Sequence, residues 1–108
     1  YGFTDVVEVE DGKQAWEYFQ KNKQRISLLL LDWIMPELDG LEVCRLIRNT
    51  NVEHYVYIIF LSVIKEKEEI ARCLEAGADD YILKPIHAKE FYARITVGLR
   101  IIALERTL

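Results

Sequence analysis

The sequence predicts an α/β fold with a parallel sheet and helices on both faces. Two observations favour this fold. The runs Leu28–Leu31 and Tyr55–Leu61 contain no alternation of apolar and polar residues, which is typical of strands covered on both faces. Stretches with helical spacing of apolar residues lie between the strand-like runs. A strand, a helix and a second strand in this order form a right-handed crossover between parallel strands.

The elements alternate along the whole chain. We expect strands at 3–10, 28–31, 55–61 and 81–83 and helices at 13–22, 40–49, 65–76 and 88–108. Asp39 and Gly40 open the second helix, and Gly77 is placed to end the third one in a left-handed conformation. The order βαβαβαβα fits a flavodoxin-like, doubly wound sheet.

The composition limits the classes of function. The 108 residues suffice for one domain with a single core, and the formal net charge of −4 gives no attraction for nucleic acid or an anionic membrane. No apolar run is long enough to span a bilayer, and the first residues lack a signal-peptide core. Cys44 and Cys73 match neither a disulfide framework nor a zinc pattern. We therefore expect buried, reduced thiols in a cytoplasmic protein without a direct nucleic-acid or membrane partner.

Three polar residues stand where predicted strands end: Asp32, Ser62 and Lys84. The carboxyl ends of parallel strands meet at one edge of the sheet, so these side chains should lie close together. A carboxylate can act as a nucleophile, while a lysine and a hydroxyl can neutralise and bind a phosphoryl group. Each residue alone has an ordinary explanation, as a turn cap, a surface charge or a loop hydroxyl. Their joint placement favours a phosphoryl-transfer site.

The same residues carry a resemblance to a known family. Asp32 followed by Met35-Pro36 and Asp39-Gly40, then Ser62, then the stretch 77–85 ending in Lys84-Pro85, resemble the receiver domain of bacterial two-component response regulators. The resemblance covers the whole chain. It implies a signalling module and not an enzyme.

The resemblance also implies roles for individual residues. Asp32 would accept a phosphoryl group from a histidine kinase or a phosphotransfer protein, with Ser62 and Lys84 assisting. Ser62 and Tyr81 would change position together after phosphorylation and so control an output domain outside this chain. The peptide bond between Lys84 and Pro85 would be cis, as it is in the family.

The sequence departs from the family at its beginning, because it starts after the family's first strand and helix. We expect residues 1–108 to form one N-terminally incomplete receiver domain. Asp32 and the carbonyl of Ile34 could bind Mg²⁺, but the family's paired acidic residues are absent, so strong binding of Mg²⁺ by this chain is doubtful.

The missing strand would lie between the strand at 3–10 and the leucine strand, and its loss would leave a gap in the sheet. Three explanations compete: the chain is a fragment, a partner donates a strand, or the sheet closes in another arrangement. The first is favoured, because every remaining element follows the receiver pattern.

The last predicted helix is longer than its sheet requires. Residues 96–108 are a candidate linker or dimerisation extension, since an apolar seam continues beyond the inward face through Val97, Ile101, Leu104 and Leu108. A homodimer is therefore one expectation. His54 and His87 have no neighbours at metal-ligand spacing and are expected on the surface.

Two other classes of function are alternatives to the signalling module. A phosphorylation-independent interaction or dimerisation module would keep the fold without the switch, and the missing acidic residues favour it. A flavodoxin-like electron carrier needs a hydroxyl- and glycine-rich phosphate loop, and the residues from Asp32 to Pro36 do not form one.

Overall fold

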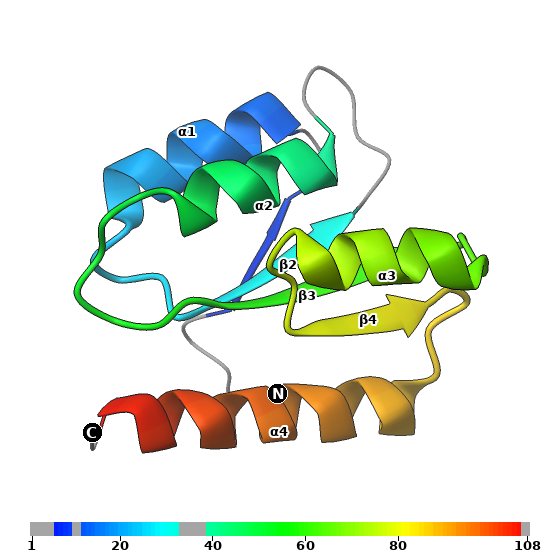
Figure 1. Cartoon of the computed structure of the whole chain (residues 1–108). Coiled ribbons are helices and arrows are strands. Elements are labelled where there is room, and N and C mark those ends of the chain that lie inside the picture. The colour runs from blue at the N-terminus through cyan, green and yellow to red at the C-terminus, as the bar shows by residue number, and fades with distance from the viewer. Residues whose placement is uncertain (1–5, 10–11, 33–38, 107–108) are drawn as a thin grey trace.

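The computed structural model describes residues 6–9, 12–32 and 39–106. Within these residues the chain forms one sheet with helices packed on both sides (Figure 1). The elements are β1 (Val6–Val9), α1 (Gly12–Asn22), β2 (Leu28–Asp32), α2 (Gly40–Arg48), β3 (Tyr57–Ser62), α3 (Lys67–Glu75), β4 (Asp80–Leu83) and α4 (Ala88–Arg106). All the strand pairs are parallel, in the order β1-β2-β3-β4. The predicted order of elements and the α/β fold class are confirmed.

The expected gap in the sheet is wrong for this structure. β1 pairs directly with β2 along its full length, from Val6 opposite Leu28 to Val9 opposite Leu31. The strand at the start of the chain thus takes the position that the resemblance gave to the missing strand. This pairing satisfies backbone groups of β2 that would otherwise be left unbonded in the interior. It corresponds to the third explanation, closure of the sheet in another arrangement.

The uninterrupted apolar strands are explained by two separate core layers. Leu29 and Leu31 of β2 point to the side covered by α1, α2 and α3, while Leu28 and Leu30 point to α4. Successive residues of a strand face opposite sides, so both sets of leucines become buried. β3 repeats this division and is buried throughout. Among the described helices, Figure 1 shows α4 on one side of the sheet and α1 and α2 on the other.

Capping residues fix the start of α2 and the end of α3. The Asp39 side chain accepts a hydrogen bond of 3.0 Å from the backbone N–H of Glu42, as expected of an N-cap. Gly77 follows α3 and adopts φ +118°, a conformation that other residues rarely accept. Both predicted helix boundaries are confirmed.

Helical spacing in the sequence predicts that Ile70, Cys73 and Leu74 share the inward face of α3, and the structure confirms this only in part. Cys73 is the buried residue of this helix, whereas Leu74 is 46% exposed and Ile70 is half-buried. α3 packs beside β4, the last strand of the sheet, and therefore has less apolar surface to cover.

Burial raises the pKa of Cys73 to about 12 and that of Cys44 to about 11, so both thiols stay protonated near neutral pH.

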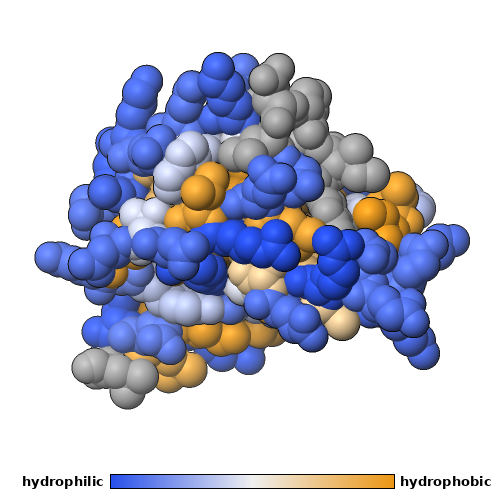
Figure 2. All heavy atoms as spheres, turned by 45° about the horizontal axis from the view of Figure 1, so that its top comes forward, coloured by the Kyte–Doolittle hydropathy of each residue, from blue (hydrophilic) through white to orange (hydrophobic). Residues whose placement is uncertain are grey.

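Polar side chains cover most of the face shown in Figure 2, and the apolar side chains lie in smaller areas between them. Hydrophilic residues on the outer sides of amphipathic helices produce such a surface. Among the described helices, none is both long enough and apolar enough to cross a membrane.

Replacing Gly98 with alanine should destabilise the fold by about 2 kcal/mol, through overpacking of the core. Alanine normally stabilises a helix relative to glycine, but a Cβ here would lie 2.8 Å from two ring carbons of Tyr57 and 3.2 Å from Leu28. Tyr57 is buried beneath α4, so its ring cannot swing into solvent. Chemical denaturation of Gly98→Ala measures this effect. A variant as stable as the original protein would show that α4 shifts outward at no cost.

Candidate functional site at the carboxyl edge of the sheet

Asp32 and Lys84 form an ion pair at the carboxyl edge of the sheet. Asp32 is the last residue of β2, and Lys84 follows β4 directly. The Lys84 Nζ lies 2.6 Å from Oδ2 of Asp32, although the two residues are far apart in the sequence. Both side chains remain about one-third exposed. A carboxylate that solvent can reach is thus held next to a fixed positive charge.

Ser62 ends β3, between the strands that lead to Asp32 and Lys84. Its backbone carbonyl accepts a hydrogen bond of 2.8 Å from the N–H of Lys84. Its side chain is buried, and its Oγ accepts a hydrogen bond of 3.1 Å from the N–H of Ile64. The hydroxyl keeps its own proton for donation, and the Tyr81 side chain is one partner within reach.

Tyr81 is tied to the same loop. Its phenol donates a hydrogen bond of 2.8 Å to the carbonyl of Ile64, whose N–H is bonded to Ser62. Burial raises the pKa of the Tyr81 phenol, and a hydrogen bond with the Ser62 side chain partly offsets this increase. Ser62 and Tyr81, the two residues that the resemblance linked as a switch, are thus both hydrogen-bonded to the backbone of Ile64. Tyr81 also packs against the core on the side of α1, α2 and α3.

The bond between Lys84 and Pro85 is cis, as the resemblance implied. The carbonyl of Ile34, the other candidate Mg²⁺ ligand, lies outside the described residues. The described part of the chain contains no group of three or more His, Cys, Asp or Glu side chains that could hold a metal ion. One oxygen of Asp32 is already paired to Lys84, and Mg²⁺ usually takes one or two carboxylates together with waters and phosphate oxygens, so the described residues supply at most part of a magnesium site.

The two histidines differ. His87 is exposed, as predicted. His54 is half-buried, and its Nε2 lies 2.6 Å from the carbonyl oxygen of Ile26. Because a carbonyl can only accept, Nε2 is the donor, and the expectation of a surface histidine is wrong here. No sequence pattern links a loop residue to a carbonyl so far away along the chain.

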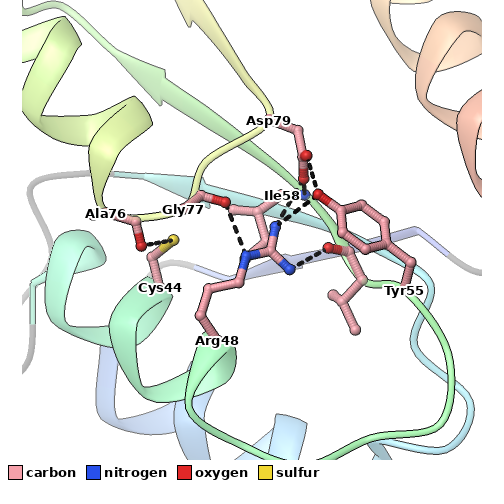
Figure 3. A network of polar contacts seen from close by, with 8 residues as sticks. Cys44, Arg48, Tyr55, Ile58, Ala76, Gly77 and Asp79 are labelled. Atoms are coloured by element: carbon pink, nitrogen blue, oxygen red, sulfur yellow. Dashed lines mark hydrogen bonds and ion pairs between the residues drawn. The ribbon is translucent and has the colours of Figure 1, made fainter.

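A second polar cluster, at the opposite edge of the sheet, was missed by sequence analysis. Arg48, Tyr55 and Asp79 come together there from α2, the loop before β3 and the loop before β4 (Figure 3). Each of these residue types is common on a protein surface, so only the three-dimensional structure identifies the cluster.

The arrangement defines a class of protein: a parallel α/β domain that presents an acid, an alcohol and an amine at one edge of its sheet. Residues 1–96 match the response regulator receiver domain family. The chain therefore belongs to the receiver domains of response regulators, which are signalling modules.

Several named proteins are similar to this chain. It is 37% identical over 87 residues to response regulator RppA of Synechocystis sp., covering 81% of this chain and 36% of that protein. Over 98 residues it is 34% identical to chemotaxis protein CheY1 of Helicobacter pylori, covering 91% of this chain and 78% of CheY1. The chain thus spans about a third of the length of RppA but most of CheY1.

Solved structures agree with this assignment. The BeF3-activated receiver domain of RstA from Klebsiella pneumoniae superposes with a TM-score of 0.75 at 33% identity, covering 89% of this chain and 78% of that one. A signal receiver domain from Vibrio parahaemolyticus superposes with a TM-score of 0.83 over 95% of this chain and 76% of its own, but at 23% identity it supports the fold alone.

Proposed function

We propose that this chain accepts a phosphoryl group on the Asp32 carboxylate and relays the event to an output domain. The observation that carries the proposal is the ion pair between Asp32 and Lys84 at the carboxyl edge. Membership of the receiver family supports it. The phosphodonor would be a sensor histidine kinase or a phosphotransfer protein.

The transfer can be written in terms of the described residues. A carboxylate oxygen of Asp32 forms the new bond to phosphorus while the bond between phosphorus and the donor breaks. The electron pair of the broken bond leaves with the donor, which is a histidine nitrogen or, for acetyl phosphate, an acetate oxygen. Lys84 offsets the negative charge that two anions bring together.

The same geometry supports a switch after transfer. The Ser62 hydroxyl has a proton that it can donate to a phosphoryl oxygen on Asp32. Movement of Ser62 towards that oxygen would change its hydrogen bond with Ile64, and the Tyr81 phenol is bonded to the carbonyl of Ile64. Phosphorylation would in this way shift the population between two arrangements of Ser62 and Tyr81.

Receiver domains are generally dependent on Mg²⁺. The described residues supply at most part of a site for it, and the transfer above uses only the side chains of this chain. Experiments on this chain should nevertheless include Mg²⁺, because receiver domains generally depend on it.

Intact-mass measurement after incubation with Mg²⁺ and acetyl phosphate tests the proposal. A gain of one phosphoryl group that is lost in Asp32→Asn supports it. No gain, both in this chain and in a version extended by a receiver's first strand and helix, would instead favour a phosphorylation-independent interaction module.

The exposed side of α4 supports a further part of the proposal, a homodimer or a link to the output domain. Val97 is 40% exposed and Leu104 is 60% exposed, while Ile101 between them is half-buried; Leu108 lies outside the described residues. Exposed apolar residues at such spacing are typical of a helix that packs against another helix.

If two copies associate through this seam, Leu104→Lys should shift the protein towards the monomer. Sedimentation at increasing protein concentration measures this, with Ala103→Lys on the adjacent exposed position as the control. A chain that stays monomeric at high concentration, whether phosphorylated or not, would rule out the dimer and leave residues 96–108 as a linker.

A further inference from the structure

The guanidinium of Arg48 joins the end of α2 to the starts of β3 and β4, at the amino edge of the sheet (Figure 3). Nε donates to the carbonyl of Gly77 at 2.9 Å, and Nη1 donates to the carbonyl of Val56 at 2.7 Å. Nη2 forms an ion pair of 2.8 Å with Oδ2 of Asp79. One side chain therefore holds three segments of the chain together.

Asp79 is bound from several directions. Besides Arg48, it accepts a hydrogen bond of 2.8 Å from the N–H of Ile58 and another from the hydroxyl of Tyr55. The Tyr55 ring also lies 5.0 Å from the carbon at the centre of the guanidinium. The Asp79 side chain is only 17% exposed. Water therefore cannot readily replace these partners. We call the cluster of Arg48, Tyr55 and Asp79 the amino-edge clasp.

The amino-edge clasp fixes where β4 begins. Gly77 passes so close to Arg48 that a Cβ at this position would lie 2.6 Å from Cγ of Arg48. The N–H of Asp79 donates to the carbonyl of Ile58 at 2.8 Å, and β4 starts at the next residue. β4 has four residues and pairs with β3 as the last strand of the described sheet. So short an edge strand forms few backbone hydrogen bonds with β3, which stabilise it only weakly. Its register therefore depends on the contacts that hold its ends.

The far end of β4 carries the residues of the candidate phosphorylation site. Lys84 reaches Asp32 and Tyr81 reaches Ile64 only in the observed register. A slip of one residue would displace Lys84 by about 3.3 Å along the strand and turn alternate side chains to the opposite face. Either change would break the contact between the lysine and the carboxylate.

We propose that Arg48 and Asp79 are positioning residues for phosphoryl transfer: by holding the start of β4 at the amino edge, they keep Lys84 against Asp32 at the carboxyl edge. The effect on the rate of phosphoryl transfer rests on the proposed function. Control of the register of β4 by Arg48 and Asp79 does not depend on it.

Two variants of the amino-edge clasp test this role. Asp79→Asn removes the charge and keeps the shape, whereas Tyr55→Phe removes one hydrogen bond and keeps the ring beneath Arg48. Ile102→Val serves as the control, because Ile102 belongs to α4 and is buried against the sheet, on the side opposite to α2 and α3. Hydrogen exchange of the Lys84 amide, compared with the amides of β2, reports the attachment of β4. Acetyl phosphate with Mg²⁺ gives the rate of phosphorylation by intact mass.

Asp79→Asn should speed exchange at Lys84 about tenfold more than exchange in β2, and should lower the phosphorylation rate of the folded protein about tenfold. Tyr55→Phe should act in the same direction with a smaller effect, and it carries the test if Asp79→Asn does not fold. Ile102→Val should change exchange at both strands equally and leave the phosphorylation rate unchanged.

Two results together would overturn the proposal. In the clasp variants, hydrogen exchange would change equally at Lys84 and in β2, and the phosphorylation rate would equal that of the control. If the unaltered chain gains no phosphoryl group, the proposed function fails, and the exchange ratio alone still decides whether the amino-edge clasp positions β4.

Discussion

Replacing Asp32 with asparagine should abolish the gain of a phosphoryl group completely. An amide oxygen is a far weaker nucleophile than a carboxylate oxygen and cannot form an acyl phosphate. Asparagine has nearly the same shape and can still accept a hydrogen bond from Lys84, so the fold should be retained. The original ion pair is about one-third exposed, and its loss should cost at most about 1 kcal/mol of stability. Intact mass after exposure to acetyl phosphate gives the result.

Asp39→Asn is the matched control for this experiment. Asp39 caps α2 through its side-chain oxygen, and asparagine caps a helix equally well. The control should therefore gain one phosphoryl group at the original rate. An Asp32→Asn protein that is still phosphorylated would place the acceptor on another residue.

Replacing Lys84 with methionine should lower the rate of phosphoryl transfer about a hundredfold, the loss expected when one charged group is removed from a transfer site. Methionine is unbranched and of similar length but carries no charge. The backbone N–H of Lys84 would remain bonded to the carbonyl of Ser62, so β4 should stay in place. The rate is measured from the time course of intact mass at a fixed concentration of acetyl phosphate.

Lys65→Met provides the comparison, because Lys65 is an exposed lysine in the loop after β3. It should leave the rate unchanged. Equal rates in Lys84→Met and the original protein would mean that the ion pair with Asp32 is only a feature of the unphosphorylated surface.

The main features of the fold follow from the sequence because they depend on local patterns. Uninterrupted apolar runs identified β2 and β3, and the structure shows each of them between two core layers. Asp39 and Gly77 indicated helix ends because a side-chain cap and a positive φ angle both depend only on residues nearby in the sequence. The pairing of β1 with β2 was not predicted, because the choice of neighbour depends on which strand edges are available in the folded sheet.

The candidate site was accessible to prediction for a related reason. Asp32, Ser62 and Lys84 each stand at a strand end, and a parallel sheet brings such ends to one edge. The amino-edge clasp was not accessible, since Arg48 and Asp79 belong to different helix–strand junctions and meet only after packing. The role of His54 escaped prediction in the same way.

The location of the phosphoryl group is the most direct test of this account. Fragmentation of the phosphorylated chain should place a single, hydrolytically labile phosphoryl group on Asp32, at the end of the buried leucine strand. A stable phosphate ester on the hydroxyl of Ser62, or an unmodified Asp32 in a chain that has gained mass, would contradict it.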